Sequence, residues 1–249
     1  MSSAHPQETR EAGPSSRART VLAAFLVLLV AAFLALGTWQ VQRLFWKLDL
    51  IARVESRIHA DPVRAPGRAE WPSVDREKDE YRRVTATGLF QHDRTVLVQA
   101  VTERGAGFWV VTPLVLADGS AILINRGFVP ADRSTPEARL AGEIAAGPVA
   151  VTGLLRITEP RGAFLRSNDP AADRWFSRDV AAIAAAKGLA DVAPYFIDAD
   201  ATPNPGGLPI GGLTVVAFRN SHLVYALTWY ALAAMSVVAA WRVCRRRVT

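Results

Sequence analysis

The chain has 249 residues, half of them hydrophobic, and a formal net charge of +6 at pH 7. The excess charge lies at the two ends: residues 1–19 carry +1 and the stretch from Arg242 onward carries +4, which leaves +1 for everything between. A nucleic-acid-binding domain concentrates its positive charge on the domain itself, so nucleic acid is excluded as a partner. The only cysteine is Cys244, so the middle of the chain forms no disulfide and offers no thiolate for copper, zinc or redox chemistry.

The N-terminal part is predicted to be a tail followed by a membrane anchor. Residues 1–19 are rich in Ser, Pro, Arg and Glu and are expected to be a disordered cytoplasmic tail. Residues 20–39 are almost wholly apolar and long enough for one transmembrane helix. The alternative is a signal peptide cleaved near Ala35-Leu36-Gly37. The length of the apolar run and the helical pattern that follows it favour an uncleaved anchor.

That pattern predicts an amphipathic helix over residues 40–60. Apolar residues recur there at helical spacing, namely at Val41, Leu44, Phe45, Leu48, Ile51, Val54 and Ile58. Asp61-Pro62 ends the helix, and the prolines and charges of the next twenty residues indicate a linker.

Short strand signals fill most of the remaining chain. Strands are predicted at Arg83–Phe90, Thr95–Ala100, Phe108–Leu116, Ala121–Val129, Val149–Leu155, Tyr195–Asp198 and Leu213–Phe218. Asp118-Gly119 between two of them is a strong hairpin signal. One alanine-rich helix is predicted at Arg178–Lys187 and a short turn at Pro136–Leu140. Residues 61–221 are therefore expected to form an α+β, mainly antiparallel domain, a barrel or a sandwich.

The C-terminal part is predicted to be a second anchor. Residues 222–243 hold the apolar run Leu223–Val243, in which Arg242 is the only charged residue and which is long enough to span a bilayer. Residues 244–249 form a basic tail. Because cationic flanks stay in the cytoplasm, both termini are expected there and the β-rich domain on the far side.

Few residues could carry chemistry. The four histidines, His5, His59, His92 and His222, fall in separate segments, and neither an HExxH nor a GxSxG motif is present. A zinc or copper centre held by the protein and an exported enzyme are both disfavoured. Copper insertion is disfavoured too, because the chain has only two methionines besides its one cysteine.

His222 stands just outside the second anchor and has two interpretations. It is either a polar residue at the membrane interface, with Tyr225 and Trp229 as ordinary aromatic neighbours, or an axial ligand to haem iron. In the second case Arg219, Arg43 and Arg82 are candidates to bind the haem propionates. Trp39, Gln40 and Arg43 form a similar cluster where the first anchor emerges, and the alternative is again an aromatic belt residue with a snorkelling cation.

Seven blocks of the chain, taken in order, resemble the surfeit locus protein 1 family. The first block, Gly37-Thr38-Trp39-Gln40-Val41-Gln42-Arg43, is similar to its G-x-W-Q-x-x-R signature. The others begin at Glu80, Val111, Ile122, Arg174, Pro194 and Arg219, and the last runs through His222 to Tyr230. The resemblance covers about residues 36–240 and includes the two-anchor layout.

The resemblance implies an assembly factor for haem–copper oxidases of the cytochrome c oxidase type, not an enzyme. It further implies transient binding of haem a and its delivery to the catalytic subunit, with His222 matching the family's haem-linked histidine. Membrane lipid, the oxidase catalytic subunit and haem a synthase are the implied partners. The alternative function is a scaffold that stabilises the apo-oxidase subunit and never binds haem. Because Glu8 and Glu11 make the tail unlike a mitochondrial transit peptide, a bacterial inner membrane is the expected location.

Overall fold

The computed structural model describes residues 16–139, 147–160, 162, 166–216, 218 and 220–245. The chain divides into two compact units, one made of Met1–Ile51 with Phe218–Thr249 and the other of Ala52–Ala217.

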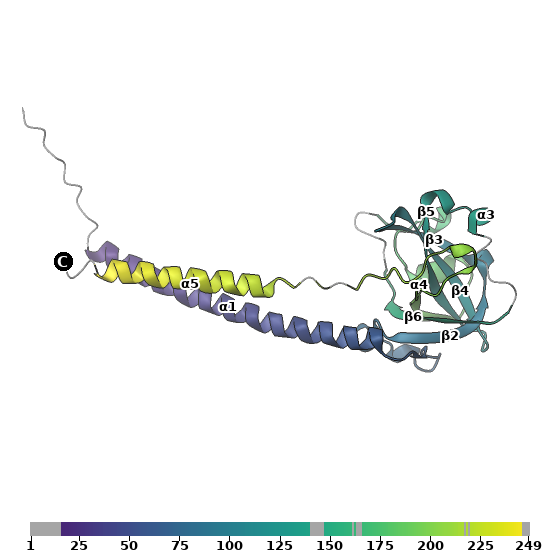
Figure 1. Ribbon diagram of the computed structural model, residues 1–249, viewed down its shortest axis with the longest axis horizontal. Coiled ribbons are helices and arrows are strands. Elements are labelled where there is room, and N and C mark those ends of the chain that lie inside the picture. The colour runs from purple at the N-terminus through teal and green to yellow at the C-terminus, as the bar shows by residue number, and fades with distance from the viewer. Residues whose placement is uncertain are drawn as a thin grey trace, which may run out of the picture. The chain divides into compact units, whose positions relative to one another are not determined.

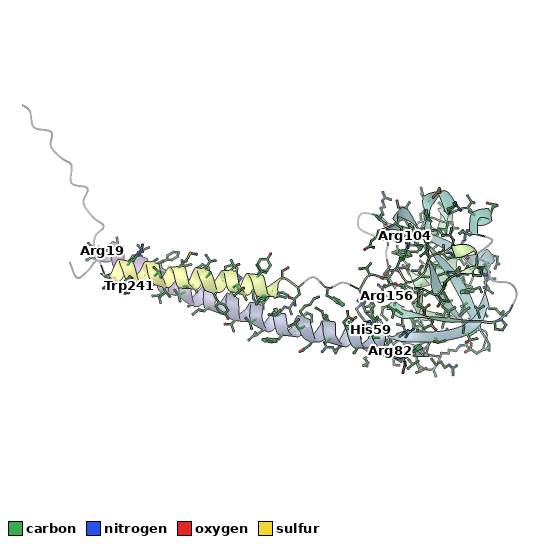
Figure 2. All side chains as sticks on the ribbon, in the orientation of Figure 1. Arg19, His59, Arg82, Arg104, Arg156 and Trp241 are labelled. Carbon is green, nitrogen blue, oxygen red and sulfur yellow. The ribbon has the colours of Figure 1, made fainter. Side chains whose placement is uncertain are left out.

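Two antiparallel helices form the described part of the first unit, except that the last turns of one of them, from Ala52 on, belong to the second unit. The helices α1 (Ser16–His59) and α5 (His222–Arg245) lie side by side (Figure 1). Arg19 of α1 and Trp241 of α5 mark the same end of the pair (Figure 2). α1 runs without a break from the predicted span through the predicted amphipathic segment. It begins at Ser16, so residues 16–19, predicted to belong to the disordered tail, are helical. These four residues include alanine and two arginines, which extend a helix at little cost.

Small residues bring the two helices close together. Gly37 is buried, and a Cβ added to it would lie 2.7 Å from Cε1 of Tyr230. On α5, Ala226 and Ala233 are the buried apolar residues, and the rings of Phe33 and Trp229 stack with centroids 5.7 Å apart. Small contact residues of this kind are typical of helices that pack inside a bilayer.

Most of the other apolar side chains of this unit point outward. Val21 and Leu28, for example, are 69% and 68% exposed. Both helices are long and apolar enough to cross a membrane. An exposed apolar surface of this extent is unfavourable in water and suits contact with lipid.

The second unit is built on one seven-stranded, mostly antiparallel sheet. Its strands are β1 (Val63–Arg64), β2 (Arg83–Phe90), β3 (Val96–Thr102), β4 (Gly105–Leu116), β5 (Ala121–Pro130), β6 (Val149–Ile157) and β7 (Val192–Ala199). The strand order is β1-β2-β6-β7-β5-β4-β3, and a further pairing of β2 with β4 closes β2, β6, β7, β5 and β4 into a ring. The domain is therefore a barrel, which decides between the two architectures that the sequence left open.

The closure depends on close backbone contact at Gly88. This residue pairs with Leu116 of β4 and with Val149 of β6. A Cβ added here would lie 2.3 Å from the carbonyl oxygen of Val115, so only glycine allows the approach. Inside the ring, Val84, Leu114, Ile122, Ile124, Leu155, Tyr195 and Ile197 are completely buried.

A second apolar cluster lies between the sheet and the helix α4 (Val180–Ala186), which falls within the predicted helix Arg178–Lys187. Asp179 caps its N-terminus by accepting a hydrogen bond from the Ala182 amide at 3.2 Å. Trp175 and Ile183, both buried, are the large residues of the cluster. The short helices α2 (Arg76–Asp79) and α3 (Pro136–Arg139) complete the helical elements of the described residues, apart from single 3-10 turns.

The predicted strand at Leu213–Phe218 is wrong. The described residues of this stretch form no strand. The preceding strand, β7, already pairs with β6 on one side and β5 on the other, so no sheet edge is free beside it. Instead a side chain attaches this stretch to the sheet: the Thr214 hydroxyl donates a hydrogen bond to Asp198 Oδ2 of β7 at 2.9 Å.

Candidate functional site

The helix pair brings His222 and Gln40 together. His222 is the first residue of α5, and its backbone amide donates a hydrogen bond to Asn220 Oδ1 at 3.3 Å. Its ring nitrogen Nδ1 lies 2.8 Å from Oε1 of Gln40 on α1. Both side chains are half-buried. The contact joins two residues that are far apart in sequence and that the sequence analysis had selected separately.

The pair lies at one end of the apolar part of the helices. At the opposite end, Thr20 and Val243 line the same small hollow. From Thr20 to Gln40, α1 rises by about 30 Å, which matches the hydrocarbon thickness of a bilayer. The contact between His222 and Gln40 therefore falls at the level where a membrane-spanning pair of helices would meet water.

The other predicted site residues of this unit do not converge on His222. Trp39 and Tyr225 are 50% and 55% exposed, and Trp229 stacks on Phe33. The guanidinium carbon of Arg43 lies 4.8 Å from the centroid of the Trp46 ring, on the same helix. Arg219 lies outside the described residues.

The donor set at this end fits a haem iron. A histidine held through Nδ1 keeps Nε2 for a ligand, and none of the hydrogen bonds among the described residues involves Nε2 of His222. The exposed aromatic rings of Trp39 and Tyr225 provide apolar surface nearby in the chain. One imidazole with apolar neighbours suits a flat macrocycle that is held weakly.

The remaining histidines lie in other surroundings. His59 is exposed at the end of α1 and contacts the carbonyl oxygen of Glu55 at 2.9 Å. His92 belongs to the barrel domain, where its Nδ1 is 3.4 Å from Nη1 of Arg126. His5 lies outside the described residues. Among the described residues, no three His, Cys, Asp or Glu side chains gather as a metal site.

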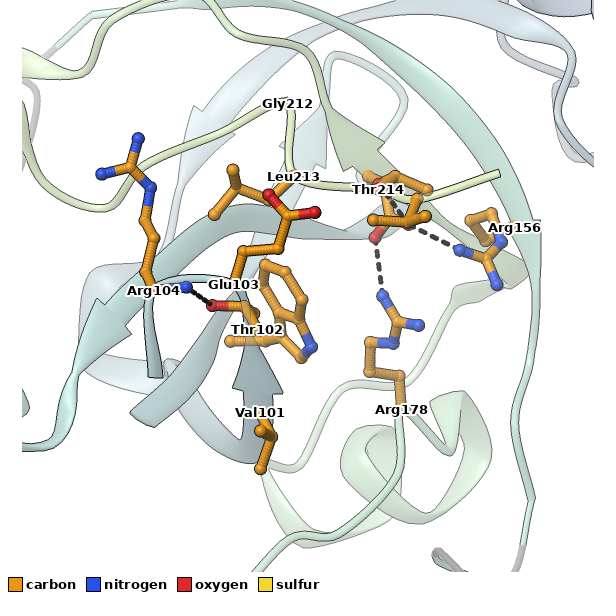
Figure 3. Close-up of a pocket in the computed structure, with 12 residues that line it drawn as sticks. Val101, Thr102, Glu103, Arg104, Arg156, Arg178, Gly212, Leu213 and Thr214 are labelled. Atoms are coloured by element: carbon orange, nitrogen blue, oxygen red, sulfur yellow. Dashed lines mark hydrogen bonds and ion pairs between the residues drawn. The ribbon is translucent and has the colours of Figure 1, made fainter. Parts of the chain in front are cut away.

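The barrel domain contains a cavity of about 470 Å³ (Figure 3). The tip between β3 and β4 forms one wall with Glu103 and Arg104, and the stretch from Gly212 to Val215 forms another. Arg156 and Arg178 lie at its polar side.

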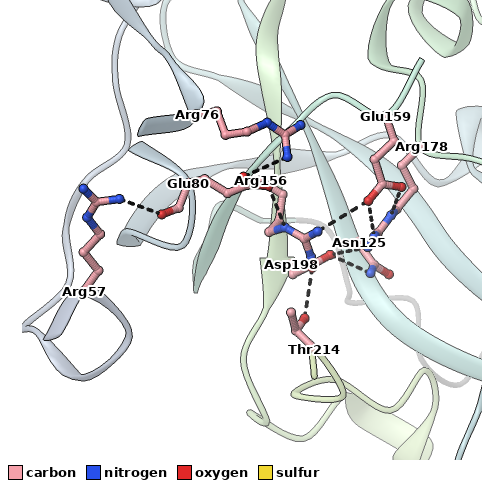
Figure 4. Close-up of polar contacts among 9 residues, drawn as sticks. All are labelled: Arg57, Arg76, Glu80, Asn125, Arg156, Glu159, Arg178, Asp198 and Thr214. Carbon is pink, nitrogen blue, oxygen red and sulfur yellow. Dashed lines mark hydrogen bonds and ion pairs between the residues drawn. The ribbon is translucent and has the colours of Figure 1, made fainter. Parts of the chain in front are cut away.

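Both of these arginines belong to a buried network around Asp198 (Figure 4). The side chain of Asp198 is 2% exposed and accepts hydrogen bonds of 2.8 Å from each guanidinium. Asn125 Nδ2 and the Thr214 hydroxyl donate to the same carboxylate at 2.8 and 2.9 Å. Four donors thus satisfy both oxygens of a carboxylate that burial would otherwise make costly.

Two further carboxylates contact these arginines. Glu159 accepts two hydrogen bonds from Arg178, at 2.7 and 3.1 Å, in a fork-shaped contact. Glu80 Oε1 lies 3.7 Å from Nε of Arg156. Burial by itself would lower the pKa of Arg178, but Asp198 and Glu159 raise it above its ordinary value. Since carboxylates of the same domain neutralise these cations, the network stabilises the fold and does not offer a free site for an anion.

Sequence reasoning missed this network, and its assignment of Arg82 as a candidate for a haem propionate stays a prediction. Arg82 forms an ion pair with Asp79 of α2, so its charge is already matched within the barrel domain. The signal for the network was available: Asn125, followed by Arg126, and Asp198 each interrupt an apolar run, and a polar residue at a core position needs a partner. Three separate blocks of the family resemblance supply Asn125, Arg178 and Asp198.

Comparison with known proteins gives concordant matches. The model of the SURF1 family matches residues 27–234. Surfeit locus protein 1 of Mus musculus is 41% identical over 228 residues, with 84% of this chain and 71% of the mouse protein covered. The Homo sapiens protein is also 41% identical, with 84% and 72% covered. A SURF1-like protein of Monosiga brevicollis is 38% identical over 250 residues, with 95% and 92% covered.

Proposed function

Because the chain belongs to the SURF1 family, known for cytochrome oxidase assembly factors, we propose that it binds haem a transiently and assists its insertion into an oxidase. The acceptor is the catalytic subunit of a haem–copper terminal oxidase of the cytochrome c type. The observation that carries this proposal is the placement of His222 at the end of the helix pair, with Nδ1 on Gln40 and Nε2 outside every hydrogen bond of the described residues.

Transient binding agrees with a single protein ligand. A carrier has to hold its cargo and also release it, and one neutral imidazole provides a bond without the strength of two axial ligands. The apolar surface of α1 and α5 supports contact with lipid and with the membrane segments of a partner.

Replacing His222 tests the ligand assignment. Protein purified in detergent from a host that makes haem a is expected to show a Soret band proportional to protein concentration. His222→Ala should lower the haem content per protein at least about tenfold, since the iron loses its protein donor. His59→Ala is the matched control, because this exposed histidine lies on α1 away from Gln40, and it should keep the haem content unchanged.

The outcomes separate the possible functions. Unchanged haem in His222→Ala would show that the ligand lies elsewhere. Wild-type protein that purifies without haem, yet still supports oxidase assembly in a deletion strain, would favour a scaffold for the apo-subunit.

The proposed topology has both termini in the cytoplasm of a bacterial cell and the barrel domain outside. Cys244, the only cysteine, is exposed at the end of α5. A membrane-impermeant maleimide should therefore label it only after spheroplasts are lysed. A second protein with Cys244→Ser and Glu103→Cys, at the exposed β3–β4 tip, should be labelled in intact spheroplasts. The reverse pattern would contradict the topology.

A further inference from the structure

His222, the candidate ligand, contacts α1 through Gln40. Among the described residues, this is the only hydrogen bond between His222 and a side chain of α1. An amide oxygen such as Oε1 only accepts hydrogen bonds. The 2.8 Å contact therefore requires the proton of a neutral imidazole to be on Nδ1 of His222. The lone pair that can bind a metal is then on Nε2.

We propose that Gln40 is a positioning residue that fixes the tautomer and the ring orientation of His222, so that Nε2 is directed to the iron. This inference rests on the proposed function, because it concerns the ligand of the proposed cargo. Metal-binding histidines commonly donate their second ring N–H to an acceptor, which holds the ring and raises the basicity of the ligand. Here the acceptor comes from the neighbouring helix.

The packing of the two helices also fixes the position of Gln40, the acceptor. One turn before Gln40, Gly37 contacts the Tyr230 ring so closely that a Cβ would not fit without movement. The Thr38 hydroxyl is 3.4 Å from the Tyr230 hydroxyl. On α5, the hydrogen bond that the His222 backbone amide donates to Asn220 Oδ1 holds the first residue of the helix. Both backbones are therefore restrained, and the two side chains meet with little loss of conformational entropy.

A second consequence concerns ligand strength. A neutral amide accepts a weaker hydrogen bond than a carboxylate does, so it polarises the imidazole only moderately. A glutamine acceptor thus suits a ligand that must later release its cargo.

The test compares Gln40→Leu, which removes the acceptor, with Gln40→Glu, which restores it as a carboxylate. Gln42→Leu is the matched control, because Gln42 is exposed on the same helix. Gln40→Leu should weaken haem retention about tenfold and lower the frequency of the iron–histidine stretch in resonance Raman spectra. Gln40→Glu should retain haem and raise that frequency, and Gln42→Leu should match the wild type.

A readout without haem uses ¹⁵N NMR of the haem-free protein labelled at histidine. The wild type should show His222 in the Nδ1–H form, and Gln40→Leu should shift it toward the Nε2–H form. A wild type in the Nε2–H form, or a Gln40→Leu protein with unchanged tautomer and Raman frequency, would overturn the positioning role. If instead haem persists in His222→Ala, the assignment of His222 as the ligand fails, while the NMR result still decides whether Gln40 sets the tautomer.

Discussion

Asp198→Asn is expected to lower the free energy of unfolding of the barrel domain by about 3 kcal/mol, since breaking a buried ion pair leaves uncompensated charge. The amide keeps the size of the side chain but turns one acceptor oxygen into a donor. That donor would face either Arg156 and Thr214 or Arg178 and Asn125, all of which already donate to the carboxylate. The loss of stability has two causes. One buried polar group is left without a partner, and the two guanidiniums keep only Glu159 and Glu80 as carboxylate partners.

Hydrogen exchange is the appropriate measurement, because it reports on the barrel strands separately from the two long helices. Amides of β6 and β7 should exchange at least about a hundredfold faster in Asp198→Asn, as a loss of about 3 kcal/mol requires. Asp191→Asn is the control: this aspartate pairs with Arg68 at the surface, where both side chains are nearly half exposed. Such pairs contribute at most about 1 kcal/mol. Equal effects of the two substitutions would show that the network does not stabilise the core.

Gly88→Val is expected to prevent proper closure of the barrel and to destabilise the domain by about 3 kcal/mol, at the upper end for an overpacked site. The reason is that the new Cβ would approach the Val115 carbonyl oxygen to 2.3 Å and its carbon to 2.9 Å. These are backbone atoms, so they cannot turn away as a side chain would. Relief requires β2 and β4 to separate.

The effect should be localised as well as large. The amides of β2 and β4 near Gly88 should lose protection first, while α5 keeps its own. Gly147→Val serves as the control, because a Cβ at Gly147 meets no atom of the described residues within 4 Å. Retained protection between β2 and β4 in Gly88→Val would mean that the ring closes without the close approach.

The sequence predicted the local elements better than their partners. The strand at Arg83–Phe90 and the hairpin at Asp118-Gly119 follow from alternation and turn chemistry, which act over a few residues. Closure of β2 on β4 does not, because it depends on strands separated by three others in the sheet order. The strand predicted at Leu213–Phe218 failed for the same reason, since its β-branched residues had no free edge beside β7.

In the candidate site, too, the sequence predicted the local positions of the residues but not their partners. Hydropathy placed His222 and Gln40 each at the end of an apolar run. Whether they meet depends on the rotation of α5 about its axis, which the contacts of Gly37 and Tyr230 determine. Likewise, the apolar context of Asp198 signals a buried carboxylate, but its partners Arg156 and Arg178 come from separate segments and cannot be read from spacing.

The closed ring also restricts how the domain can recognise another protein. Each of β2, β6, β7, β5 and β4 has a neighbour on both sides, so none of them can accept an incoming strand by edge addition. Recognition through the ring must therefore use side chains and loops, and its specificity can change without disturbing the backbone pairing that maintains the barrel.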